Sequence, residues 1–241
     1  MKYISRFLLL LFILSFTLTT KSYSIEHNKK YIYLTFDDGP TSKNTPALLD
    51  ELKKLNLPAT FFIVGKLVNE NPDVLKRIIE ENHSIGLHTM SHNKNKCYSS
   101  QENFINENIE LQSLLQEKYN ISTNILRFPF GSQNQYLKMN NEFLNKLHEN
   151  NFKIFDWHID TYDALHPDNN PETILDICKN QYNKRYVDKD EIIILLHTNS
   201  NNQKTIKSIR LLKDYFSNLG YEFSSLKCNT PEYYYRIKQN N

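Results

Sequence analysis

The sequence predicts a single α/β domain built around a parallel sheet, and three observations predict it. Seven runs of apolar and β-branched residues recur along the chain, with helical segments between them. Residues 192–196 are apolar without a break, which is typical of a strand buried on both faces. The 241 residues suffice for one well-buried domain and are too few for two large ones. Such alternation indicates a sheet either closed as a barrel or open and doubly wound.

The expected strands are the seven apolar runs, each bounded by polar or turn-forming residues. In chain order they are residues 31–36, 59–64, 84–88, 125–128, 153–157, 191–197 and 221–226.

Helices are expected between and after these runs, where capping residues and prolines mark their starts. Thr45 and Asn71 stand at capping positions, each directly before a proline. Ser99 and Glu102 have the spacing of a capping box. The expected helices span residues 45–55, 71–81, 99–119, 141–150, 171–184 and 203–219.

The N-terminus has the features of a targeting segment. Lys2 and Arg6 precede the apolar run 7–16, and small residues follow at Ser22 and Ser24. We expect residues 1–24 to be a signal peptide that is cleaved near Ser24, which would make the protein secreted or cell-wall associated. The alternative is an uncleaved membrane anchor, although the run is shorter than the ~20 residues of a spanning helix.

We expect the rest of the chain to consist of a short linker at 25–30, a main domain at 31–228 and a C-terminal tail at 229–241. The three cysteines, Cys97, Cys178 and Cys228, have no metal-ligand spacing. One disulfide plus one free thiol, or three buried thiols, both fit.

Composition excludes several classes of function. The charge of +2 comes from 29 basic and 27 acidic residues without a basic block, so no nucleic-acid partner is expected. Only five glycines are present, and no phosphate-binding loop of the dinucleotide or nucleoside triphosphate type occurs. No obligate protein partner is evident either.

Chemically active side chains stand at the C-terminal ends of the expected strands or directly after them. In barrels of βα units, catalytic groups gather at this face. The residues in question are Asp37, Asp38, His88, Arg127, Asp156, Trp157 and His197, with His92 four residues after His88.

Each of these residues also has a structural explanation. The run from Asp37 to Pro40 contains turn-forming residues, and Trp157 could serve core packing alone. Arg127 could form a surface salt bridge, but the apolar residues around it suggest a guanidinium directed at buried carboxylates. Because Asp37 and Asp38 would repel each other unless a cation compensates them, the combination favours a metal site.

One carboxylate and two imidazoles, from Asp38, His88 and His92, suit zinc or a similar divalent ion with open positions for water and substrate. Such an ion supports hydrolysis. Asp37 would then be free to take a proton from water, and His197 could protonate the leaving atom. This set suits cleavage of an amide or ester, and the second ligand cluster of a dinuclear phosphoesterase is missing.

The ordered motifs TFDDGP, HTMSH, RFPFG, FDW and LLH resemble those of the NodB-homology polysaccharide deacetylases, carbohydrate esterase family 4. The resemblance covers residues 31 to 226. It implies a distorted (β/α)7-8 barrel that removes acetyl groups from N-acetylated sugars with one divalent metal ion, zinc first and cobalt or manganese as alternatives.

The resemblance also implies a role for each matched residue. Asp37 would be the base, Arg127 would orient it, and His197 would be the acid. Asp156 would tune that acid. The metal ligands would be Asp38, His88 and His92. Phe130 stands where the family usually has tyrosine, and its N–H would contribute to the oxyanion hole. Trp157 would form an aromatic wall of the site, and Leu195 would form the pocket for the acetyl methyl.

The expected substrate is an N-acetylated polysaccharide, with N-acetylglucosamine of peptidoglycan as the first choice. Chitin oligosaccharides, poly-N-acetylglucosamine, N-acetylmuramic acid and acetylated xylan remain alternatives. A different class also stays open, a glycan-binding barrel without turnover, although binding alone requires neither an acid nor a base.

Overall fold

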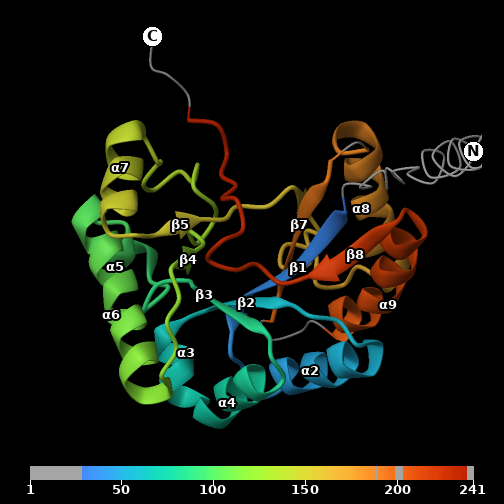
Figure 1. The fold of residues 1–241 in the computed structure, drawn as a ribbon, viewed down its shortest axis with the longest axis horizontal. Helices are drawn as coiled ribbons and strands as arrows, with labels where there is room; N and C mark the ends of the chain where they lie inside the picture. Colours follow the sequence, from blue (N-terminus) through green and yellow to red (C-terminus); the bar gives the residue numbers. More distant parts are fainter. Residues whose placement is uncertain (1–28, 188, 199–202, 238–241) are drawn as a thin grey trace, which may run out of the picture.

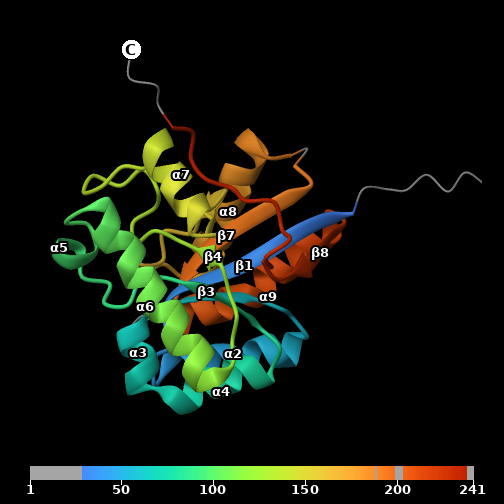
Figure 2. The same cartoon turned by 60° about the vertical axis from the view of Figure 1, so that its left-hand side comes forward.

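The computed structural model describes residues 29–187, 189–198 and 203–237. The expected signal peptide at 1–24 lies outside these residues. At the centre is a curled sheet in which the strands run in the order β5-β4-β3-β2-β1-β7-β6, and β8 pairs with β1 beside this path. Helices surround the outside of the sheet, with α2 to α4, α5 to α7, and α8 with α9 on three sides (Figures 1 and 2).

The strands are β1 (Lys30–Gly39), β2 (Thr60–Ile63), β3 (Ser84–Leu87), β4 (Ile125–Leu126), β5 (Lys153–Ile154), β6 (Ile159–Asp160), β7 (Glu191–His197) and β8 (Tyr221–Ser224). The helices are α2 (Asn44–Leu55), α3 (Gly65–Glu70), α4 (Pro72–Glu80), α5 (Lys94–Cys97), α6 (Gln101–Tyr119), α7 (Asn141–Glu149), α8 (Pro171–Arg185) and α9 (Gln203–Asn218).

All strand pairs between described residues are parallel, and β1 is the central strand. Its first half pairs with β8 and its second half with β2, while β7 lies along its other edge. Among the described residues the outer strands β5 and β6 do not pair with each other, so the barrel is open there. The distorted barrel expected from the sequence is confirmed.

The pleat of β1 separates the two sides of the sheet. Ile32, Leu34 and Phe36 are fully buried in the large cluster that packs the sheet against the helices. Tyr33 belongs to a second cluster, inside the barrel, together with Phe62, Ile125, Phe155, Ile193 and Leu226. Because side chains alternate along a strand, Thr35 and Asp37 point to the same inner side as Tyr33.

All seven expected strands are confirmed, whereas β6, α3 and α5 were not predicted. These three elements have two, six and four residues, too few for a periodic pattern to show. The strand β1 also continues through Asp37 and Asp38 instead of ending before them.

Two predicted helix starts are wrong by one or two residues. The N-cap of α6 is Ser100, whose hydroxyl accepts from Asn103 N at 3.1 Å, and not Ser99. The N-cap of α2 is Lys43, and Thr45 lies inside the helix with its N–H donating to the Thr41 hydroxyl at 3.2 Å. In both places neighbouring hydroxyl residues compete for the cap, so spacing alone does not identify it.

The predicted domain end at 228 does not separate the tail from the barrel. Tyr233 forms a parallel bridge with Phe155, directly after β5. All three cysteines are free, Cys97 and Cys178 buried and Cys228 exposed, so neither expected cysteine arrangement is found. In the described part of the chain, no helix combines the length and apolar character that crossing a bilayer requires.

Candidate active site

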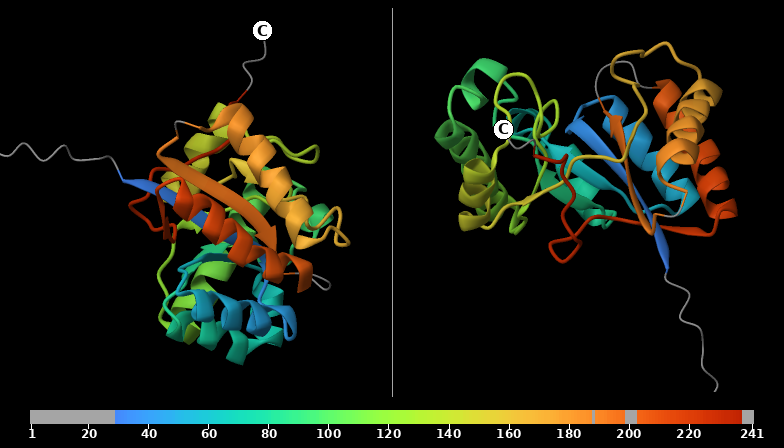
Figure 3. Two further views of the ribbon diagram at one scale, coloured as in Figure 1. Left: turned by 90° about the vertical axis from the view of Figure 1, so that its right-hand side faces the viewer. Right: turned by 90° about the horizontal axis from the view of Figure 1, so that it is seen from above.

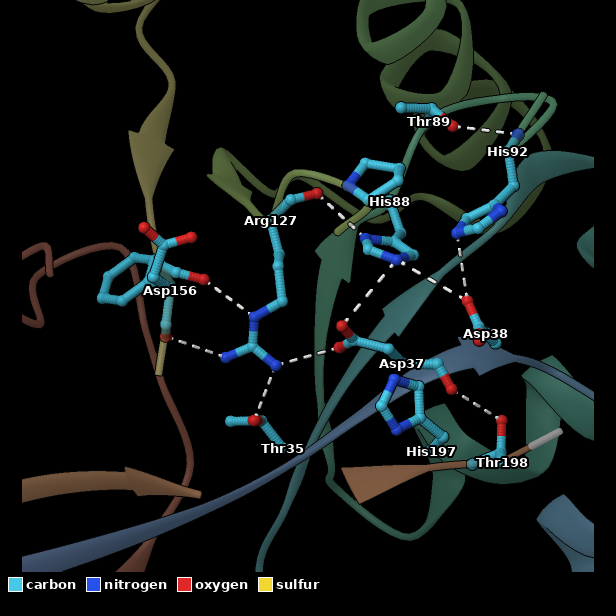
Figure 4. A network of polar contacts seen from close by, with 12 residues as sticks. Thr35, Asp37, Asp38, His88, Thr89, His92, Arg127, Asp156, His197 and Thr198 are labelled. Carbon is cyan, nitrogen blue, oxygen red and sulfur yellow. Dashed lines mark hydrogen bonds and ion pairs between the residues drawn. The ribbon is translucent and has the colours of Figure 1, made fainter. Parts of the chain in front are cut away.

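The pairing of β1 with β7 places two expected catalytic residues side by side near the C-terminal ends of these strands. Asp37 on β1 is the register partner of His197 on β7, and Thr35 is the partner of Leu195. The continuous apolar runs of both strands bury them at the centre of the sheet, so these side chains enter the barrel from a rigid base. Figure 4 shows Asp37 and His197 with the histidines and Arg127 gathered around them.

Asp38, His88 and His92, the three residues expected from the sequence, form a cluster that could hold a metal ion. One ligand atom from each lies within 4.8 Å of the other two. His92 Nε2 is 3.2 Å and His88 Nε2 is 3.6 Å from Asp38 Oδ1. Both imidazoles therefore converge on the same carboxylate oxygen, with the spacing that a bound cation would bridge.

Hydrogen bonding orients His88 as a ligand. Its Nδ1 lies 2.9 Å from the backbone oxygen of Arg127, which can only accept, so Nδ1 carries the proton and Nε2 presents its lone pair. Burial lowers the pKa of His88, which favours the neutral imidazole that a metal requires. The donor set fits zinc or a similar divalent ion.

Arg127 is fully buried and holds Asp37. Its Nη1 donates to Asp37 Oδ1 at 2.9 Å and to the Thr35 hydroxyl at 2.7 Å. Its Nε donates to the Phe155 carbonyl at 2.8 Å, and Nη2 to that of Asp156 at 3.1 Å. The guanidinium lies 4.1 Å from the Phe62 ring. The predicted role of Arg127 therefore has the geometry it needs, because Asp37 is oriented by a side chain that is itself fixed at four points.

The carboxylate that binds His197 is Asp163, which was not predicted from the sequence. Asp163 Oδ1 is 2.8 Å from His197 Nδ1, and Asp163 Oδ2 accepts from His197 N at 3.0 Å. Burial alone would lower the pKa of His197, but the hydrogen bond and the charges of Asp163, Asp37 and Asp38 together raise it to about 9. His197 is therefore held as a proton donor at neutral pH.

The expectation that Asp156 tunes His197 is wrong. The Asp156 carboxylate is fully buried and accepts from Ser132 N at 2.9 Å, from the Ser132 hydroxyl and from Tyr235 N at 2.8 Å. Burial raises its pKa, although these hydrogen bonds act in the opposite sense. The sequence signal that could have found Asp163 is the second acidic pair, Asp160 and Asp163, just after Trp157.

The catalytic groups line a cavity of about 380 Å³. Trp157, Leu195 and Phe130 line it as expected, and Asp160, Tyr162, Ala164 and Leu165 complete the wall. Phe130, Tyr162 and Leu165 are 56%, 40% and 72% exposed, so large apolar groups stand at its mouth. Phe130 N–H donates none of the backbone hydrogen bonds found between described residues, and is available to a ligand.

Backbone strain concentrates around this cavity. Among the residues that the structure describes, nine other than glycine have positive φ, and four of these are asparagines, for which the left-handed region is cheapest. The other five are Asp38, Thr89, His92, Phe130 and Tyr162, of which all but Thr89 line the cavity. Strained residues that cluster in this way are typical of sites where orientation matters more than stability.

A second hollow meets the first at the ligand set. It has a volume of about 520 Å³, and Asp38 and His92 line both cavities. Its other walls carry hydroxyl groups and the side chains of Lys43 and Lys66. The two hollows therefore lie on either side of the Asp38 and His92 side chains, one lined by polar and the other by aromatic groups.

Comparison with known proteins agrees with this geometry. The family model described as Polysaccharide deacetylase matches residues 24–155. A peptidoglycan-N-acetylglucosamine deacetylase of Bacillus cereus is 42% identical over 135 residues, which cover 56% of this chain and 48% of that relative. A further deacetylase of the same name and organism is 30% identical over 206 residues, covering 84% and 89%.

The fold has counterparts among solved structures. The catalytic domain of the peptidoglycan N-acetylglucosamine deacetylase from Eubacterium rectale superposes with a TM-score of 0.76 at 25% identity, covering 87% of this chain and 94% of that one. The chain spans about half the length of the curated relatives that match it first, 48% and 49%.

Proposed function

Because the chain belongs to the polysaccharide deacetylase family, we propose that it is a hydrolase that removes N-acetyl groups from a glycan. The observation that carries the proposal is Asp37, held by Arg127 at 2.9 Å, beside the Asp38, His88 and His92 set and opposite His197. A site for binding alone would require neither an oriented buried base nor a protonated histidine.

We propose that Asp38, His88 and His92 hold one divalent ion, zinc first and cobalt or manganese as alternatives. When bound, such an ion lowers the pKa of water and polarises a carbonyl oxygen. Asp37 then removes a proton from the attacking water, and Arg127 keeps the carboxylate pointed at it. The N–H of Phe130, which donates none of the backbone hydrogen bonds between described residues, would stabilise the charge that develops on the acetamide oxygen.

His197 completes the reaction from the other strand. Its proton passes to the departing amine, which leaves as the free amino sugar while the acetyl group leaves as acetate. Asp163 compensates the charge of the imidazolium before transfer. Leu195 is 3% exposed and lines the cavity, so it offers an apolar contact of the size of the acetyl methyl.

We propose N-acetylglucosamine of peptidoglycan as the substrate. The relatives named for this activity support the choice, and so do the exposed aromatic rings at the mouth of the cavity, which suit contact with sugar rings. N-acetylmuramic acid, chitin oligosaccharides, poly-N-acetylglucosamine and acetylated xylan are the alternatives. We also propose that the chain is exported through residues 1–24, which N-terminal sequencing of the protein from the cell surface would test.

An assay of acetate release tests the proposed function directly. We expect release from peptidoglycan with zinc or cobalt present, more slowly from chitin oligomers and acetylated xylan, and near-complete loss in Asp37→Asn. This variant keeps the size and hydrogen-bonding shape of the side chain but cannot take a proton. Equal release by both proteins would contradict the assignment of the base. Glycan binding without release by either would favour the non-catalytic barrel.

A further inference from the structure

The C-terminal segment 230–237, which we call the strap, runs along the open side of the barrel. It is the red segment that passes between the half with α5 to α7 and the half with α8 and α9 (Figures 1 and 3). Tyr233 N donates to the Ile154 carbonyl at 3.1 Å, and Asp156 N donates to the Tyr233 carbonyl at 2.7 Å. The strap thus pairs with the edge of β5 that β4 does not cover.

Side chains on both sides of this bridge anchor the strap. The ring of Tyr233 stacks on His158 with centroids 3.7 Å apart. Glu232 Oε2 accepts from Ile154 N at 3.2 Å, and Glu232 Oε1 lies 2.9 Å from His148 Nε2 on α7. The strap is therefore tied to β5, to α7 and to the segment between β5 and β6.

Beyond the bridge, the strap reaches a loop of the active site. Tyr235 N donates to Asp156 Oδ2 at 2.8 Å, and Ser132 donates to the same carboxylate through its N–H and its hydroxyl. Ser132 lies two residues after Phe130. Because the Asp156 carboxylate is fully buried, it depends on these protein donors in place of water.

The residues next to the Tyr233 bridge also help to orient Asp37, the proposed base. The carbonyls of Phe155 and Asp156 accept from Arg127 at 2.8 and 3.1 Å, and Arg127 donates to Asp37. Phe155 and Asp156 are the residues that face the Tyr233 bridge. One short contact region therefore connects the strap with both the loop of Phe130 and the orientation of Asp37.

We propose that the strap is a positioning element of the active site and that the Tyr235 N–H, through Asp156 and Ser132, fixes the loop that carries Phe130. This inference rests on the proposed function. Loss of the N–H would leave a buried carboxylate oxygen with one donor fewer, so Asp156 would turn or release Ser132. A loop displaced by about 1 Å lowers turnover by up to about 100-fold without removing any catalytic group.

Variants at one position separate the N–H from the side chain. Tyr235→Pro removes the N–H, whereas Tyr235→Phe and Tyr235→Ala keep it, the first with a ring and the second without. We expect kcat to fall roughly 10-fold or more in Tyr235→Pro alone, with KM and zinc affinity within about 2-fold of the parent, because Asp38, His88 and His92 lie on other segments. A kcat in Tyr235→Pro equal to that of Tyr235→Ala would overturn the proposal.

Truncation provides a second test that does not depend on proline. Removal of residues 236–241 keeps every contact described for Tyr233 and Tyr235, whereas removal of residues 233–241 deletes them. We expect near-parental kcat in the first and the Tyr235→Pro defect in the second. Equal kcat in both truncations would also overturn the inference.

Trp157 is the single tryptophan of the chain, so its fluorescence reports on the strap without an activity assay. Its ring lies 5.6 Å from that of Tyr235, and a Cβ on Gly131 would lie 3.1 Å from its Cη2. Acrylamide should quench Trp157 more strongly in Tyr235→Pro than in Tyr235→Ala. If the parent protein releases no acetate, the proposed function fails, and the quenching comparison alone tests the role of the strap. Equal quenching in Tyr235→Pro and Tyr235→Ala would refute that role.

Discussion

Asp163 binds His197 at two points, with Oδ1 2.8 Å from Nδ1 of the ring and Oδ2 3.0 Å from the backbone nitrogen. The Thr205 hydroxyl on α9 donates to the same Oδ2 at 3.0 Å. The acid of the proposed reaction is therefore oriented by a carboxylate on the β6–α8 loop and a hydroxyl on α9. Asp163 is 1% exposed, so solvent screens its charge only weakly.

Asp163→Asn should make the enzyme lose activity at high pH earlier than the parent. His197 donates its proton only when charged, and its pKa of about 9 keeps it charged through neutral pH. Without the Asp163 charge, burial lowers this pKa, so the alkaline limb of kcat/KM should move down by about 1 pH unit or more. Asp168→Asn, at an exposed site, is the control and should leave the profile unchanged.

Arg127→Ala should destabilise the fold as well as abolish activity. Arg127 and Asp37 form an ion pair in which neither side chain is more than 5% exposed, so the variant leaves an uncompensated buried carboxylate. Removal of one partner of such a pair costs about 3–5 kcal/mol of unfolding free energy, measurable by denaturant titration. Arg210→Ala, which removes a partly exposed pair with Glu51 at 3.6 Å, should cost less than about 1 kcal/mol.

These residues also show how far the sequence alone could lead. Strands β1 and β7 were predictable because their apolar runs are long, and the polar residues that directly follow these runs, Asp37 and His197, were found with them. Asp38, His88 and His92 were predictable because a metal requires such donors at such spacing. Asp163 was missed because β6 has two residues and its contact with His197 is purely tertiary.

Asp156 shows the opposite error. It lies at the end of a predicted strand, directly before a tryptophan, and both properties fit a residue that tunes a catalytic acid. The contact that determines its role comes from Tyr235, 79 residues later, in a tail that carries no periodic signal. Sequence patterns describe each strand by itself, whereas the pairing of the strap with β5 depends on which edge the curled sheet leaves free.

His92→Ala should weaken metal binding strongly while the fold persists. His92 supplies one of three convergent ligands, and its side chain is 28% exposed, so little packing is lost. We expect zinc affinity to fall by roughly 100-fold or more in calorimetric titration, and acetate release to fall with it. His166→Ala, at an exposed site in the same segment as the pocket wall, should bind zinc as the parent does. Unchanged zinc affinity in His92→Ala would contradict the proposed ligand set.

Phe130→Gly should separate the two roles expected of this position. Glycine keeps the main-chain N–H that would face the oxyanion and adopts the φ of 65° without strain. The ring, 56% exposed and 5.6 Å from that of His92, is lost from the cavity mouth. We therefore expect KM for glycan oligomers to rise while kcat stays within a few-fold of the parent. The melting temperature should change little, because relief of about 1 kcal/mol of backbone strain offsets the lost contacts. A 100-fold fall in kcat at unchanged KM would instead assign the ring itself to the chemical step.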